Sequence, residues 1–159
     1  MTNENERAGH LEAIYRQRLL QLFHHPLGTG DPDVAAARGW AKNRTCGDEV
    51  TFFSMQEDNS IKNCWQATAG CAIATATASL LVQETPGKTP EECRFLLQTI
   101  RQMVFEGKDP EGEAEWKILS AVHQLSSRHE CVGVALKAME RSLNPENPEN
   151  SEGVGDAVK

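Results

Sequence analysis

Thr45-Cys46-Gly47-Asp48 is followed directly by Glu49-Val50-Thr51-Phe52-Phe53. This transition from a turn to an apolar run is the starting point for interpreting the rest of the chain. A thiol and a carboxylate stand two residues apart, and both supply anionic ligands to a soft or borderline metal. The glycine between them lets the backbone bend so that the two side chains converge. A cysteine and an aspartate in a turn are common without a metal, so the pattern indicates a metal site only if other ligands join it.

A small antiparallel sheet is expected around this turn. Residues 49–56 are predicted to form a strand, residues 57–60 a turn, and residues 61–68 a returning strand. Residues 33–42 are expected to form the first strand, although the three alanines at 35–37 would equally suit a helix. One side of the returning strand is expected to carry Ile61, Asn63, Trp65 and Ala67.

Helices are predicted before and after this sheet in the sequence. Residues 10 to about 24 show the apolar period of a helix, which the Pro- and Gly-containing loop at residues 25–30 ends. A helix rich in small residues is expected from Gly70 or Cys71 to about Val82, and small residues allow close backbone packing.

Two helix start signals follow in the last third of the chain. Thr89-Pro90-Glu91-Glu92 has the pattern of a capping box with proline at the first helical position, and its helix is expected to end at Gly107. Residues 109–112 are expected to open another helix. Residues 127–130 form a second possible capping box, which places Cys131 in the first turn of a last helix ending near Leu143. The predicted fold class is therefore α+β, with a three-stranded antiparallel sheet packed against a long N-terminal helix and a C-terminal helical set.

The totals favour one globular domain. With 159 residues, 39% hydrophobic and 25% charged, the chain can bury a core, which we expect within residues 10–143. Residues 1–9 and the polar tail at 144–159 are expected to be disordered. The net charge of −7 argues against a nucleic-acid partner, and no apolar run approaches the roughly 20 residues that span a membrane. The polar, acidic start is not typical of a secretory signal, so a cytoplasmic location is expected.

The cysteines favour metal or thiol chemistry over a disulfide framework, because their number is odd and nothing indicates export. They are Cys46, Cys64, Cys71, Cys93 and Cys131. Cys71 and Cys131 are expected at helix N-termini, where the helix dipole stabilises the thiolate and lowers the pKa of the thiol.

With Cys46 and Asp48, these two residues would form a tetrahedral set of three sulfurs and one oxygen suited to Zn²⁺. The alternative is that unlinked cysteines are buried small hydrophobes. Cys64 and Cys93 are interpreted in that way.

Three sequence blocks contain the candidate ligands: Asn43-Arg44-Thr45-Cys46-Gly47-Asp48, Ala69-Gly70-Cys71-Ala72-Ile73-Ala74 and Arg128-His129-Glu130-Cys131. In this order, with Leu11-Glu12-Ala13-Ile14-Tyr15 and His25-Pro26-Leu27-Gly28 before them, they resemble the U-type iron–sulfur cluster assembly proteins over about residues 10–143. The resemblance implies the SufE/IscU-like fold of that IscU/NifU-like family.

Within the family the chain is most similar to the SufU branch. Residues 107–127 resemble the SufU-type insertion, whereas the IscU branch has a short connection before its third cysteine. IscU-type proteins also carry a histidine ligand directly before that cysteine, where this chain has Glu130. His129 is one position further away and is expected to be solvated, so Asp48 is favoured as the fourth ligand.

The SufU resemblance implies a zinc-dependent sulfurtransferase that takes persulfide sulfur from a SufS-type cysteine desulfurase and serves downstream assembly or apo-proteins. Zn²⁺ would rest on Cys46, Asp48, Cys71 and Cys131 until the desulfurase displaces one thiolate, which then attacks the persulfide. Cys46 on its loop is expected to accept the sulfur, with Cys131 as the second choice. Arg128 is expected beside the site, holding Cys131 or steadying a persulfide anion.

Two other functions remain open. The same residues would bind a [2Fe–2S] cluster in a scaffold without turnover, as the IscU resemblance implies, or zinc would be purely structural. The chain departs from the family at Arg44, where a proline is usual, at Glu130, and in lacking the Leu-Gly-Asp of the insertion. The partner-facing surface is therefore expected to differ, which leaves the cognate desulfurase open.

Overall fold

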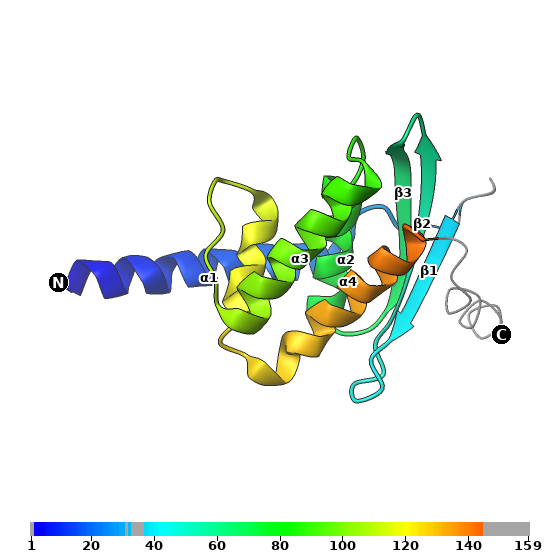
Figure 1. Ribbon diagram of the computed structural model, residues 1–159. Coiled ribbons are helices and arrows are strands. Elements are labelled where there is room, and N and C mark those ends of the chain that lie inside the picture. Colours follow the sequence, from blue (N-terminus) through cyan, green and yellow to red (C-terminus); the bar gives the residue numbers. More distant parts are fainter. Residues whose placement is uncertain (1, 31, 33–36, 145–159) are drawn as a thin grey trace.

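The computed structural model describes residues 2–30, 32 and 37–144. It has the predicted α+β fold with a three-stranded antiparallel sheet. The strand order is β1-β2-β3, and helices cover one face of the sheet (Figure 1). None of the described helices has the length and apolar content needed to cross a membrane. The elements in chain order are α1 (Thr2–His24), β1 (Ala37–Lys42), β2 (Glu49–Glu57), β3 (Ser60–Ala69), α2 (Ala72–Glu84), α3 (Pro90–Glu106), the 3₁₀-helices η1 (Glu115–Val122) and η2 (Ser126–Arg128), and α4 (His129–Ser142).

Two predictions reach beyond these residues. Residues 33–36 and 145–159 lie outside the described part of the chain. The start of the strand predicted at residues 33–42 and nearly all of the tail predicted at residues 144–159 therefore fall outside it. The described part of the first strand, β1, pairs with β2 along its whole length.

The β2–β3 hairpin turns at Asp58 and Asn59, whose φ angles are 54° and 61°. Two adjacent left-handed residues give a turn whose twist suits paired strands, and aspartate and asparagine adopt this conformation more readily than most side chains. The hairpin confirms the turn predicted at residues 57–60.

The predicted side-chain alternation of β3 is wrong beyond its first residue. The pairing of β2 with β3 shifts between Met55 and Gln56, so that the strands carry an irregularity close to the hairpin. Ile61 is buried as expected, but Cys64 and Gln66 are also buried on the core side. A bulge exchanges the two faces of a strand, and the sequence pattern gave no sign of it.

Helix α2 packs closely against the loop that follows α1, as its small residues predicted. The backbone N of Leu27 donates to Ser79 Oγ at 3.0 Å. Gly28 has a φ of 64°, and a Cβ there would collide with the side chain of Val82. The same loop pairs with the edge of β3, where the backbone N of Gln66 donates to the carbonyl oxygen of Gly28 at 2.8 Å.

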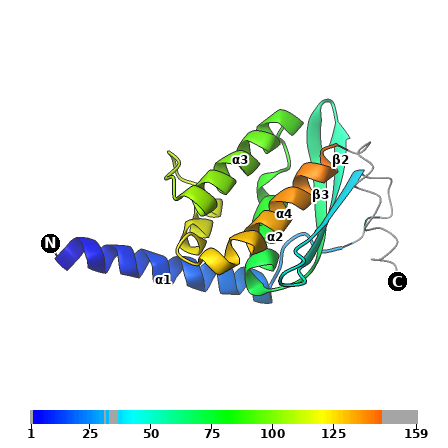
Figure 2. The ribbon, with the colours of Figure 1, turned by 60° about the horizontal axis from the view of Figure 1, so that its bottom comes forward.

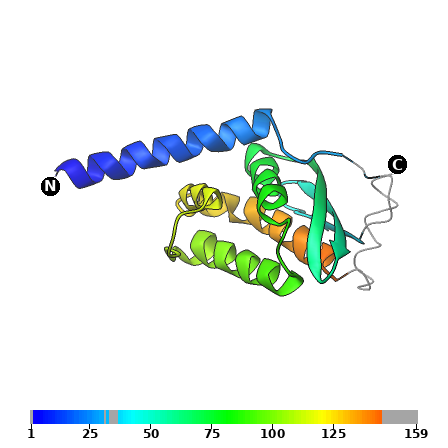
Figure 3. The same cartoon turned by 90° about the horizontal axis from the view of Figure 1, so that it is seen from above.

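Helix α1 is longer than the sequence predicted. We expected disorder over residues 1–9, whereas α1 begins at Thr2. Its N-terminal half extends past the other helices, as Figures 2 and 3 show from two further sides. Leu19 and Leu22 near its end are buried, while Leu11 is 48% exposed. The apolar period therefore marked only the packed part, and residues with good helix propensity continue the helix beyond it.

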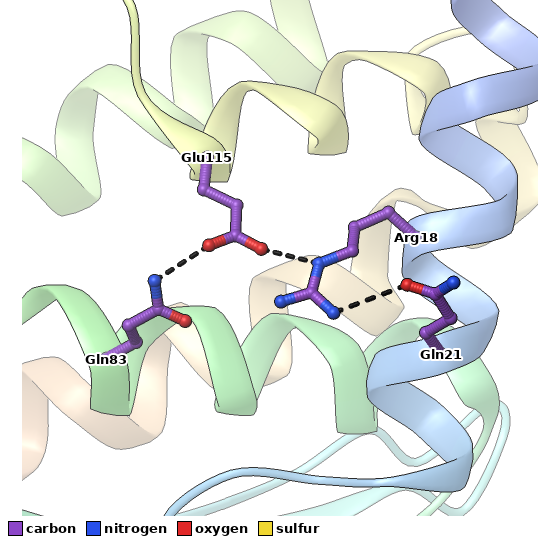
Figure 4. A network of polar contacts seen from close by, with 4 residues as sticks. All are labelled: Arg18, Gln21, Gln83 and Glu115. Carbon is purple, nitrogen blue, oxygen red and sulfur yellow. Dashed lines mark hydrogen bonds and ion pairs between the residues drawn. The ribbon is translucent and has the colours of Figure 1, made fainter.

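Glu115 joins η1 to α1 and α2 (Figure 4). Its carboxylate accepts hydrogen bonds from Arg18 Nε at 2.5 Å and from Gln83 Nε2 at 2.7 Å. Burial raises the pKa of Glu115, but the hydrogen bonds from Gln83 and Arg18 and the charge of Arg18 outweigh it and lower the pKa overall. An ionised carboxylate therefore ties together three helices from distant parts of the sequence.

Helix α3 has the predicted caps. The backbone N of Glu92 donates to Thr89 Oγ1, and the backbone N of Thr89 donates to Glu92 Oε1, both at 3.1 Å. Gly107 ends the helix with a φ of 75°. These bonds satisfy two amide groups that the first turn of a helix otherwise leaves unpaired.

The segment between α3 and α4 differs from the prediction. Residues 109–112 do not begin an α-helix; the 3₁₀-helix η1 begins at Glu115 instead and buries Trp116 and Leu119. The capping box predicted at residues 127–130 does not form, because residues 126–128 wind into η2 and α4 starts at His129 without a side-chain cap bond. Cys131 nevertheless lies in the first turn of α4, as expected.

Gly39 lets strand β1 approach helix α4. A Cβ at this position would collide with the backbone of Ala138 and Ser142. Arg141 Nη1 also donates to the carbonyl oxygen of Trp40 at 2.7 Å. This close contact fixes α4 along the strand that leads into the Cys46 turn.

Candidate metal centre

Three segments that are distant in the sequence meet at one end of the fold. The β1–β2 turn carries Cys46 and Asp48, Cys71 precedes α2, and Cys131 lies in the first turn of α4. In Figure 1 this turn and the two helix starts lie toward the lower side of the molecule. The ligand atoms of Cys46, Asp48 and Cys131 all lie within 4.8 Å of one another.

The β1–β2 turn is held by hydrogen bonds around Asn43. Its backbone N donates to the carbonyl oxygen of Asp48 at 2.8 Å, and its own carbonyl oxygen accepts from the backbone N of Gly47 at 2.6 Å. Its Oδ1 accepts from the backbone N of Thr45 at 3.2 Å. Gly47 has a φ of 80°, which glycine adopts at little cost. The turn leaves Cys46 exposed at its tip.

Asp48 is buried and orients two parts of the site. Only 2% of its surface is exposed. Its Oδ1 accepts a hydrogen bond from the backbone N of Cys71 at 2.9 Å. A Cβ at Gly70 would approach Oδ1 to 2.7 Å, so the glycine leaves the space that this carboxylate occupies. Oδ2 faces the thiols, and Cys71 Sγ lies 3.9 Å from it.

Cys71 is the N-cap residue of α2. Its Sγ accepts from the backbone N of Ala74 at 3.5 Å, and it lies 3.9 Å from Asp48 Oδ2. A sulfur in this position faces the positive end of the helix. The prediction that a cysteine begins this helix is confirmed.

Cys131 is fully buried, unlike Cys46. Burial raises the pKa of its thiol, and side-chain hydrogen bonds and negative charge from Cys71 and Asp48 raise it further. The prediction of a lowered pKa is therefore wrong for Cys131, since desolvation and two acidic neighbours outweigh the helix dipole. A cation bound among these groups would oppose that effect by favouring the thiolate.

The donor set fits a zinc ion. Zinc–ligand distances of about 2.0–2.3 Å in a tetrahedron set the donor atoms about 3.3–3.8 Å apart. The donors of Cys46, Asp48 and Cys131 lie within 4.8 Å, so movements on the order of 1 Å would close them around an ion. Cys71 lies outside this group of three, but its contact with Asp48 Oδ2 places it next to the group as a fourth donor.

Arg128 lies beside the thiols, as the sequence predicted. A side-chain hydrogen bond with Cys131, followed by the charges of Cys131, Cys71 and Cys46, raises the pKa of its guanidinium. Its side chain is exposed, so the positive charge is presented at the surface next to Cys46. Such a guanidinium can donate hydrogen bonds to an incoming sulfur anion.

His129 and Glu130 do not join the ligand atoms. His129 is half-buried rather than solvated: its Nε2 is 2.8 Å from the carbonyl oxygen of His123, and its ring packs against Phe105. The carboxylate of Glu130 lies against Gly133, where it would be 3.0 Å from an added Cβ. Within the described residues, the one group of potential metal ligands consists of thiols and a carboxylate.

Cys64 and Cys93 pack in the core, which confirms their interpretation as small hydrophobes. Both are buried. Burial raises the pKa of Cys64 to about 12, with a further contribution from Cys93, and burial likewise raises the pKa of Cys93 to about 11. These thiols are therefore kept protonated and out of the site.

Two residues of the site were missed as functional by sequence reasoning. Gly70 was noted only as a helix start, although its lack of a side chain is what admits the carboxylate of Asp48. Asn43 was noted only as part of a block, although it closes the turn. The sequence signal for Gly70 was its position directly before Cys71. The role of Asn43 could be found only from the geometry of the turn.

Comparison with known proteins shows which sequences the chain resembles. A family model described as "NifU-like N terminal domain" matches residues 14–131. The iron–sulfur cluster assembly scaffold protein IscU of Thermotoga maritima is 27% identical over 82% of this chain and 92% of its own length. The zinc-dependent sulfurtransferase SufU of Bacillus subtilis is 23% identical over 88% of this chain and 96% of its own.

Solved structures share the fold. A putative iron–sulfur cluster assembly scaffold protein for the SUF system from Fervidobacterium islandicum AW-1 superposes with a TM-score of 0.73 at 23% identity, covering 79% of this chain and 93% of that one. A nitrogen-fixing NifU-like protein (N-terminal) from Brucella abortus has a TM-score of 0.73 at 21% identity, covering 84% of this chain and 96% of that one.

Proposed function

Because this chain belongs to the NifU-like N-terminal domain family, we propose that it serves iron–sulfur cluster assembly as a zinc-dependent acceptor of persulfide sulfur. The donor would be a SufS-type cysteine desulfurase, and the sulfur would pass to downstream assembly or apo-proteins. We propose the cytoplasm as the place of this reaction.

One observation carries this proposal. Of the three thiols that meet in the site, Cys46 is exposed, Cys71 is half-buried and Cys131 is buried. An acceptor must reach a sulfur on another protein, so accessibility selects Cys46. It also argues against Cys131, the second choice from the sequence.

The transfer step balances without an added oxidant or reductant. The thiolate of Cys46 attacks the terminal sulfur of the donor's persulfide. A bond forms between Cys46 Sγ and that sulfur, the S–S bond of the donor breaks, and the donor's cysteine leaves as a thiolate. Cys46 is left as a persulfide.

The neighbouring side chains prepare Cys46 for this step. Zinc held by Cys46, Asp48, Cys71 and Cys131 would keep the thiols deprotonated near neutral pH. Asp48 is oriented by its hydrogen bond from Cys71 N, so one carboxylate oxygen is committed to the helix and the other to the site. The positive charge of Arg128 interacts with Cys46, so Arg128 would stabilise the anionic persulfide.

A scaffold for a [2Fe–2S] cluster is the second candidate. Its support is that relatives named as scaffolds are more similar over shorter stretches, with IscU 1 of Archaeoglobus fulgidus 34% identical over 58% of this chain and 59% of its own length. Cluster and zinc would use the same thiols. The described ligand group lacks the histidine that IscU-type proteins carry before their third cysteine, so the similarity of the site itself is to the SufU type.

A desulfurase assay tests the proposal. The zinc-loaded protein is incubated with a SufS-type desulfurase and cysteine, and its mass is measured without reductant. We expect one added sulfur atom on the peptide containing Cys46 and none in Cys46→Ala. Cys93→Ala, a buried control, should accept sulfur normally. Stable visible absorption after anaerobic reconstitution with iron and sulfide, with no sulfur on Cys46, would favour the scaffold instead.

A further inference from the structure

A polar hollow of about 340 Å³ lies beside the Cys46 turn, separate from the thiol cluster. One wall is the end of β1 and the turn, residues 41–45, and the opposite wall consists of α3 and α4. Its volume is at the lower end of the range of small-ligand sites. The charged residues that line it are Lys42, Arg44, Arg101, Lys137 and Glu130.

The hollow concentrates positive charge in an acidic protein. The chain has a net charge of −7, yet four cations and one carboxylate line this space. Lys42 is paired with Glu49 at 3.6 Å. Arg44, Arg101 and Lys137 have no carboxylate within ion-pair distance among the described residues, and the guanidinium of Arg101 lies 5.3 Å from the centre of the Phe105 ring. Uncompensated cations gathered around one space raise the local concentration of anions.

Asn43 gives a second, independent indication. It lines the hollow and is 9% exposed. Its Oδ1 is used by Thr45, but its Nδ2 is buried without a hydrogen-bond acceptor. An unsatisfied buried donor costs roughly 1–3 kcal/mol, so such groups are generally retained where something accepts from them.

We propose that this hollow binds a small oxyanion carrying phosphate or carboxylate groups. Two guanidinium groups and two ammonium groups are the donors that such groups prefer, and the buried Asn43 side chain lies in the wall next to them. Glu130 also lines the hollow, and its carboxylate would disfavour ligands that place negative charge next to it. The site is distinct from the proposed zinc centre and does not depend on the sulfur-transfer function.

A ligand in this position would join two parts of the fold. Arg101 and Lys137 belong to helices, whereas Asn43 and Arg44 belong to the turn that carries Cys46. An oxyanion that accepts from both sides would therefore restrain the turn. Amide hydrogen exchange in residues 43–47 should slow on binding, while exchange in the β2–β3 hairpin should not change.

Isothermal titration of the zinc-loaded protein with inorganic phosphate and, separately, with succinate tests the site. The two probes distinguish a phosphate from a carboxylate ligand. Three variants remove donors: Lys137→Gln, Arg101→Gln and Asn43→Asp. Asn43→Asp keeps the acceptor for Thr45 N but replaces the unsatisfied donor by an acceptor. Lys62→Gln is the control, since Lys62 has the same charge but pairs with Glu57 at 2.6 Å on the β2–β3 hairpin.

We expect saturable one-to-one binding of at least one probe, weakened about tenfold or more by Lys137→Gln and Arg101→Gln, abolished by Asn43→Asp and unchanged by Lys62→Gln. Lys137 is exposed, so its replacement should not disturb folding. Absence of saturable binding of either probe at about 10 mM, or equal loss with Lys62→Gln, would overturn the proposal.

Discussion

Asp48 contacts Cys71 through both of its carboxylate oxygens: Oδ1 accepts from the backbone N at 2.9 Å, and Oδ2 lies 3.9 Å from Sγ. One side chain thus fixes the start of α2 and borders the thiols. A change at Asp48 should therefore affect stability and metal binding separately, according to which oxygen is replaced.

Replacing Asp48 by Asn and by Ala should separate these two roles. Asp48→Asn keeps an oxygen that can accept from Cys71 N, so stability should change little, but zinc affinity should fall by more than about tenfold because an anionic donor is lost. Asp48→Ala leaves the Cys71 N–H without its acceptor and should also lower the free energy of unfolding by about 1–3 kcal/mol. Chelator competition and urea unfolding measure the two effects. If zinc is purely structural, both variants will unfold alike while desulfurase activity stays unaffected.

Gly70→Ala should weaken zinc binding although it replaces no ligand. The added Cβ would lie 2.7 Å from Asp48 Oδ1 and displace the carboxylate. We expect a loss of about 1–3 kcal/mol in stability, as in other overpacked sites. Gly9→Ala is the matched control, because nothing lies within 4 Å of a Cβ at that position. Equal zinc affinity in the two variants would show that the space before Cys71 has no role in binding.

The five thiols should react with iodoacetamide in a fixed order after zinc is removed. Cys46 is exposed and should be alkylated first. Cys64 and Cys93 have pKa values of about 12 and about 11, so their thiolate fractions at pH 8 are on the order of 10⁻⁴ and 10⁻³. They should be labelled only when the protein unfolds. Peptide mass spectrometry measures the order, and early labelling of Cys64 would contradict the structure.

Glu115→Gln should make stability less dependent on acid pH. The pKa of Glu115 is lowered in the folded protein, so its contribution is present above the unfolded value of about 4.3 and is lost as pH falls through the folded value. Because the pair with Arg18 is partly exposed, we expect a loss of about 0.5–1 kcal/mol at pH 7. That difference should shrink below about pH 4 in urea unfolding. Glu12→Gln, which breaks an exposed pair with Arg16, should show a smaller effect.

Local signals in the sequence predicted those parts of the fold that local bonds determine. The capping box at Thr89 and Glu92, the glycine that ends α3 and the turn at Asp58 and Asn59 each depend on residues a few positions apart. The resemblance of the three blocks added their order along the chain, and the structure brings Cys46, Asp48 and Cys131 within reach of one another.

The features that sequence reasoning missed depend on tertiary contacts. The bulge in β2 and β3 reverses a face without a composition signal. The raised pKa of Cys131 follows from burial beside Cys71 and Asp48, which no local rule contains. The ring contact of His129 with Phe105 likewise joins residues 24 positions apart, so solvation was the natural but wrong expectation.

The projecting half of α1 has a consequence for any unfolding experiment. At about 1.5 Å per residue, the 23-residue helix is roughly 34 Å long, yet its buried leucines lie only in the last turns. A helix of this half-length is marginal in water without packing, so it should melt gradually before the body unfolds. Ellipticity would then decline at lower temperature than tryptophan fluorescence, since Trp40, Trp65 and Trp116 all lie in the packed body. A two-state fit to ellipticity alone would underestimate the unfolding enthalpy of the domain.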